Sequence, residues 1–80
     1  MPYKVFIIEY ENDEERIIWC KSELYAGFEV FHAVFDAISY LISEIGIDPR
    51  DIIVDHRYLP LRAEVYINGK LKYVIGNEYY

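Results

Sequence analysis

The chain has 80 residues, of which 54% are hydrophobic, and it carries a net charge of −6 at pH 7. This length predicts one small domain that spans residues 1–80, and the apolar content provides enough material for its core. The negative charge argues against a protein that coats DNA generally, because such proteins need a basic surface for the phosphates. Twelve Ile and the absence of Gln and Thr resemble the residue usage of hyperthermophile proteins.

The single cysteine, Cys20, cannot form a disulfide within the chain, which favours a reducing compartment. The apolar run after Lys4 ends at Glu9 and is too short for a signal peptide. No stretch approaches the roughly 20 apolar residues of a membrane-spanning helix. We therefore expect a cytoplasmic protein without membrane contact, in which Cys20 is a small buried residue of a strand.

Two strands are predicted near the N-terminus, over residues 3–10 and 16–21. A two-residue turn at Asn12-Asp13 places Glu9 opposite Arg16 and sets the register of the hairpin. Because successive strand residues point to opposite faces, this register gives two sets of cross-strand pairs. One set is Phe6–Trp19 and Ile8–Ile17, and the other is Val5–Cys20 and Ile7–Ile18. Both faces are apolar, so both are expected to be buried.

A helix is predicted next, because apolar residues recur at alternating spacings of three and four. Ser22 is the expected N-cap and Gly46 the expected stop, with regular helix from about Phe28 because Gly27 weakens the first turn. The stripe expected to face the sheet consists of Leu24, Phe28, Phe31, Phe35, Ile38, Ile42 and Ile45, widened by Val34 and Leu41.

Three further strands are predicted in the C-terminal third. The first covers residues 52–58 and is interrupted at residues 59–60 before the next begins. The last two form a hairpin, for which a three-residue loop over residues 67–69 keeps the apolar side chains on one face. That loop sets Ala63 opposite Tyr73, and residues 76–80 are expected to form a short tail.

The predicted fold class is α+β: a mainly antiparallel sheet with the order β-β-α-β-β-β and one long amphipathic helix packed on one face. One helix shields one face, whereas the two N-terminal strands are apolar on both. This deficit predicts a partner, most simply a second copy of the chain. The homodimer interface is expected on the open face, which carries either Phe6, Ile8, Ile17 and Trp19 or Val5, Ile7 and Ile18. We expect a non-enzymatic interaction or structural module.

No motif predicts catalysis, a cofactor or a metal site. His32 and Asp36 stand one helical turn apart but have no third ligand, so a solvated pair is favoured. Asp51 and Asp55 share a strand face but are about 13 Å apart, too far to hold one ion. Ile18 and Trp19, which precede Cys20, are apolar, and this favours an inert core cysteine over a thiol activated in an electropositive pocket.

Two other functions stay open. The last hairpin carries Arg62, Tyr66, Lys70 and Lys72, a basic and aromatic set that would suit single-stranded nucleic acid. The acidic remainder of the chain would repel a polyanion, which favours a solvated surface instead. The acidic turn over residues 9–15 would mimic phosphates and inhibit a protein that has a basic groove.

Overall fold

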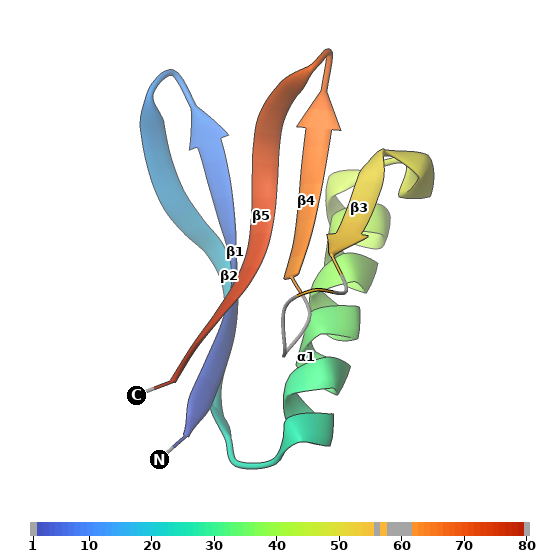
Figure 1. Cartoon of the computed structure of the whole chain (residues 1–80). Coiled ribbons are helices and arrows are strands. Elements are labelled where there is room, and N and C mark those ends of the chain that lie inside the picture. Colours follow the sequence, from blue (N-terminus) through green and yellow to red (C-terminus); the bar gives the residue numbers. More distant parts are fainter. Residues whose placement is uncertain (1, 56, 58–61, 80) are drawn as a thin grey trace.

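The structure, a computed structural model, describes residues 2–55, 57 and 62–79. Within these residues a five-stranded antiparallel sheet carries one helix on one face, which confirms the predicted α+β class (Figure 1). The strands lie in the order β2-β1-β5-β4-β3. The elements are β1 (Tyr3–Glu11), β2 (Glu14–Leu24), α1 (Gly27–Tyr40) with a π-helical turn (Leu41–Ile45), a 3-10 turn (Pro49–Asp51), β3 (Ile52–Asp55), β4 (Arg62–Ile67) and β5 (Lys70–Tyr79).

The first hairpin follows the predicted register near its turn. Asn12 and Asp13 have φ values of 52° and 65°, the left-handed pair of a two-residue hairpin turn. Glu9 consequently lies opposite Arg16, as predicted.

A β-bulge in β2 shifts the next pairs of this hairpin by one residue, and a second irregularity follows between Val5 and Tyr3. Ile8 pairs with Ile17, whereas Ile7 pairs with Trp19, so Ile18 is the extra residue. A strict alternation of faces does not reveal such an insertion, which re-aims every side chain beyond it. The predicted pairs Phe6–Trp19, Ile7–Ile18 and Val5–Cys20 are wrong by one residue; the observed pairs are Phe6–Cys20, Ile7–Trp19 and Val5–Lys21.

The bulge also decides which side chains lie beneath the helix. Val5 and Ile7 are fully buried, and Trp19 packs against the same core as the partner of Ile7. The predicted grouping of Trp19 with Phe6 and Ile8 on one face of the sheet is therefore wrong. The open face keeps Phe6 and Ile8, because they alternate with the two buried residues of β1.

The helix begins at Gly27, within one residue of the predicted start of regular helix at about Phe28, but its N-cap differs from the prediction. Ser22 is not the N-cap, because β2 continues through it. Ala26 takes the N-cap position, and the Glu29 carboxylate accepts hydrogen bonds from the backbone N–H groups of Tyr25 and Ala26. A carboxylate in the first turn also stabilises the positive end of the helix dipole. The predicted stop at Gly46 is confirmed, with φ of 85°.

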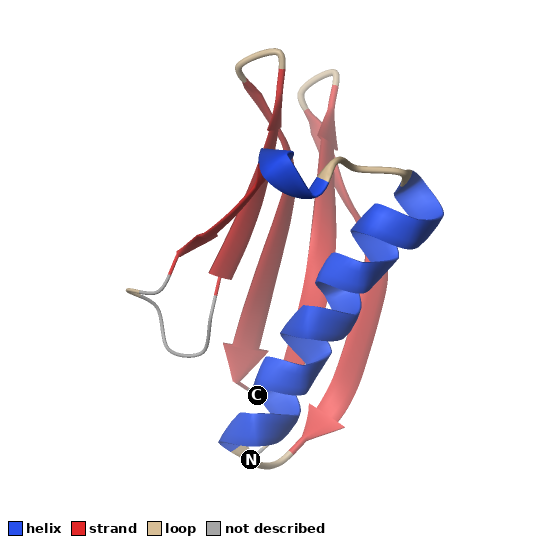
Figure 2. Cartoon of the chain, turned by 90° about the vertical axis from the view of Figure 1, so that its right-hand side faces the viewer, coloured by secondary structure: helices blue, strands red, loops and turns tan. Residues whose placement is uncertain are grey.

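α1 crosses the sheet diagonally and packs on β1, β2 and β5 (Figure 2). The buried residues of α1 and its π-helical turn are Val30, Ala33, Val34, Ala37 and Leu41. Phe28 and Phe35 are instead 67% and 55% exposed, and Ile45 is also exposed. The predicted burial of these three residues is wrong. Two alanines in the sheet-facing stripe let the helix approach the strands closely, so the bulky aromatic rings point elsewhere.

β5 is longer than predicted and joins the two halves of the sheet. Residues 76–79 are not a tail, because they continue the pairing with β1 as far as Tyr3–Tyr79. The ring of Phe6 lies over Gly76, where an added Cβ would stand 3.0 Å from the ring. A side chain at this position would require the Phe6 ring to shift by a few tenths of an ångström.

The turn between β4 and β5 uses two residues, Asn68 and Gly69, which both have positive φ. The predicted three-residue loop is wrong, and the extra residue lies in β5, at Lys72. Ala63 consequently pairs with Ile75 rather than with Tyr73. Ala63, Tyr73 and Ile75 are all buried, as predicted for the apolar face of this hairpin.

β3 ends at Asp55, three residues before the predicted end. The predicted interruption at Leu59-Pro60 lies outside the described residues.

Candidate interaction surfaces

The face of the sheet that α1 does not cover has an apolar half over β1 and β2. Phe6, Ile8 and Ile17 form this half, and we call them the outer-face patch. Ile8 and Ile17 pair directly, and Ile17 is 57% exposed. Cys20 pairs with Phe6 and is exposed, so the prediction that it is buried is wrong. The patch is smaller than predicted because the bulge removes Trp19 from it.

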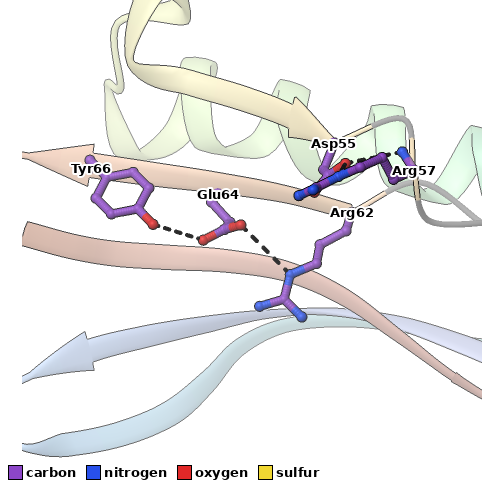
Figure 3. Close-up of polar contacts among 5 residues, drawn as sticks. All are labelled: Asp55, Arg57, Arg62, Glu64 and Tyr66. Atoms are coloured by element: carbon purple, nitrogen blue, oxygen red, sulfur yellow. Dashed lines mark hydrogen bonds and ion pairs between the residues drawn. The ribbon is translucent and has the colours of Figure 1, made fainter.

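Charged groups of β4 lie on the other half of this face, where Ile53 of β3 and Val74 of β5 pair with Glu64 from either side. Glu64 lies between Arg62 and Tyr66 on β4, as Figure 3 shows. Its carboxylate accepts a hydrogen bond of 3.0 Å from the Tyr66 hydroxyl and lies 3.9 Å from the Arg62 guanidinium. The hydrogen bond to Glu64 and the charge of that carboxylate raise the pKa of Tyr66. A second pair, Asp55–Arg57, lies 2.7 Å apart at the end of β3.

The four residues of the predicted nucleic-acid surface do not form one free basic patch. Arg62 and Tyr66 share β4 but both contact Glu64. Lys70 is the first residue of β5. The ammonium of Lys72 lies 3.7 Å from the Glu11 carboxylate and 6.0 Å from the centre of the Tyr73 ring. Three carboxylates, those of Glu9, Glu11 and Glu64, therefore offset the charges that would bind phosphates.

A charged cluster around Glu9 joins three strands. The Glu9 carboxylate accepts hydrogen bonds from the Arg16 guanidinium at 2.9 Å and from the Tyr73 hydroxyl at 3.2 Å. Its side chain is only 12% exposed. The hydrogen bond from Arg16 is the main cause that holds the pKa of Glu9 below its usual value of 4.5. Burial, together with the charge of Glu9, raises the pKa of Tyr73.

This cluster predicts a pH-dependent part of the stability. A folded-state pKa below 4.5 means that the stabilisation is complete above this value and is lost as the pH falls through the lowered pKa. Glu9→Gln is expected to destabilise the protein at pH 7 and to do so less at about pH 3. Urea unfolding of the variant and the wild type at each pH value measures the difference in their free energies of unfolding. Tyr73→Phe is the control, since it keeps the ion pair. An equal loss for Glu9→Gln at both pH values would contradict this assignment.

The two hairpin turns lie at the same end of the sheet (Figure 1). Between them is an open cleft of about 570 Å³, with Glu11, Glu14 and Glu15 on one wall and Lys70 and Lys72 on the other. The acidic turn proposed as a phosphate mimic is thus exposed but stands beside cations of its own chain.

The outer side of α1 is the second uncovered apolar surface. Phe28, Phe31, Phe35, Ile38 and Ile42 follow it at alternating spacings of three and four, and we call them the helix ridge. Phe28 and Phe35 are exposed, and the other three are half-buried. The sequence pattern detects this stripe but assigns it to the sheet, since the weaker stripe of Val and Ala is the one that the sheet uses.

The remaining candidate groups do not form a reactive centre. Asp36 is paired with Lys21 at 2.9 Å, and His32 lies beside a shallow hollow of about 260 Å³ bordered also by Leu24 and Phe28. Within the residues that the structure describes, no three His, Cys, Asp or Glu side chains converge on a metal position. No helix in the described part of the chain has the length and apolar character needed to cross a bilayer.

Comparison with known proteins does not place the chain in a family. No family model, no curated protein and no solved structure matches it.

Proposed function

We propose that this protein is a non-enzymatic interaction module of the cytoplasm that works as a homodimer. The observation that carries the proposal is the amount of apolar surface left uncovered on both sides of the fold. Ile17 on the sheet and Phe28 and Phe35 on the helix are each more than half exposed. Large exposed apolar patches mark interaction sites, because a monomer gains nothing from holding them in water.

Two surfaces are available for the contact. The outer-face patch is the interface expected from the sequence, without Trp19. The helix ridge contains more aromatic residues than the outer-face patch. Each could serve a two-fold symmetric contact, in which the same residues of both copies meet.

The mass of the particle in solution tests the proposal. Sedimentation at micromolar concentration is expected to give twice the chain mass of 9.6 kDa. A well-folded monomer at that concentration would contradict it. The exposed thiol of Cys20 requires a reducing buffer, so that a disulfide between copies is not mistaken for the dimer.

Nucleic-acid binding through Arg62, Tyr66, Lys70 and Lys72 is the alternative. It predicts association with labelled single strands that weakens strongly between about 50 and 200 mM salt. Under the homodimer proposal no such association occurs, because the net charge of −6 repels the strand and Glu64 and Glu11 offset the local cations.

A further inference from the structure

α1 carries two apolar stripes, and the chain's own core fully buries only one of them; Ile38 of the other stripe is half-buried against that core. The sheet-facing stripe is Val30, Ala33, Val34, Ala37 and Leu41. The helix ridge repeats at the three-four spacing that two packed helices share in a coiled coil. In the sequence this spacing extends to Ile42 and Ile45, which lie in the π-helical turn, and Ile45 is exposed. A surface of this kind fits another helix better than it fits a sheet.

The order of large and small side chains along the helix ridge favours a second copy of the chain as the partner. The N-terminal half holds three Phe, and the C-terminal half holds three Ile when Ile45 is included. Antiparallel pairing of two copies sets each large ring against a smaller branched side chain, as Phe28 with Ile45, Phe31 with Ile42 and Phe35 with Ile38. Parallel pairing would instead set rings against rings and leave gaps between the Ile residues. The ridge is thus complementary to itself in one orientation.

Charge does not oppose this arrangement. His32 and Ser39 flank the ridge on its solvent side, and neither is a carboxylate. The nearest acids on the helix are already engaged, since Glu29 binds the backbone at the N-cap and Asp36 pairs with Lys21. Antiparallel packing also brings each helix terminus near the oppositely charged terminus of the other copy.

The exposed area is of the right order for the core of such a contact. At roughly 200 Å² per aromatic side chain, the exposed parts of Phe28 and Phe35 amount to about 240 Å² per copy. A standard interface takes about 800 Å² from each partner. The two Phe alone supply about 30% of that area, and the half-buried members of the ridge and Ile45 add to this apolar centre.

We propose that two copies of this chain meet through the helix ridge, with their α1 helices antiparallel. The inference rests on the proposed homodimer and specifies where its copies touch. Phe35 stands at the centre of this contact and the outer-face patch lies on the opposite side of the sheet.

Sedimentation of matched variants tests the inference. Phe35→Glu is expected to weaken the dimer at least ~100-fold and give a monomer at micromolar concentration, since symmetry places the change in the interface twice. Ile17→Glu, a charge of the same kind on the outer-face patch, is expected to leave the dimer intact. Circular dichroism checks that both variants keep the fold, which their exposure in the monomer allows.

The outcomes separate this inference from the broader proposal. A monomeric Ile17→Glu with a dimeric Phe35→Glu would overturn the ridge contact but keep the homodimer. A monomeric wild type would overturn both.

Spin labels provide a measurement that does not depend on the folding of a ridge variant. The label is placed at Ser43→Cys in a Cys20→Ser background, because both positions are exposed. Antiparallel helices centred between residues 35 and 38 separate the two labels by about 20 Å, at 1.5 Å per residue. Parallel helices would hold them about 10 Å apart. The shorter distance would overturn the antiparallel arrangement, and the longer one supports it.

Discussion

Leu41→Ala is expected to lower the free energy of unfolding by about 2–5 kcal/mol, the range observed when a fully buried Leu leaves a cavity. Leu41 is completely buried at the junction of α1 with its π-helical turn, among residues of both layers. Residues of both the helix and the sheet pack around Leu41, so the cavity cannot close fully after the side chain is removed.

Urea unfolding of Leu41→Ala and of the wild type measures this loss. Both proteins are compared at equal concentration, because any self-association of the folded chain makes the apparent stability depend on concentration. Ile53→Ala is the matched control, because Ile53 is 56% exposed on β3. It is expected to change the stability by no more than about 0.5 kcal/mol. Equal effects of the two substitutions would show that Leu41 does not lie in the core.

Ala37→Asp is expected to prevent folding at neutral pH. Ala37 is fully buried on the side of α1 that faces the sheet, and the described core contains no buried polar or charged residue. An unpaired carboxylate in such a place costs several kcal/mol, which is a large part of the roughly 5–15 kcal/mol that stabilises a small domain. Far-ultraviolet circular dichroism at pH 7 is expected to show an unfolded chain.

The control for Ala37→Asp is Ser39→Asp, two residues further along α1 on its exposed side. This variant is expected to keep the native spectrum. A native spectrum and unchanged melting for Ala37→Asp would mean that the helix is rotated away from the arrangement described above. The pair thus tests the feature that the apolar pattern of the sequence assigns incorrectly, namely which stripe of α1 faces the sheet.

The difference between the two stripes shows where pattern analysis is limited. Alternating spacings of three and four select the bulkiest apolar residues, and these form the ridge at Phe28, Phe31 and Phe35. Ala33 and Ala37 carry little weight in such a pattern, yet they occupy the contact because their size permits close packing on β1 and β5. The sequence pattern therefore identifies the residues of the helix ridge but assigns them to the core.

The charged cluster at Glu9 was partly predictable. The register near the Asn12-Asp13 turn places Arg16 opposite Glu9, and that pair is present. The contribution of Tyr73 could not be foreseen, because it comes from a strand 64 residues away in the chain. Only the pairing of β5 with β1 brings the phenol to the carboxylate.

The sequence by itself determined the α+β class, the turn at Asn12-Asp13, the end of the helix at Gly46 and the excess of apolar side chains over what one helix can cover. Each of these depends on local backbone preference or on composition, which neighbouring residues encode. The tertiary structure decided the bulge at Ile18, the shift at Lys72, the length of β5 and the rotation of α1. These depend on which distant side chains pack against one another. This packing leaves Phe28 and Phe35 of the helix ridge exposed, whereas Trp19 packs against the core.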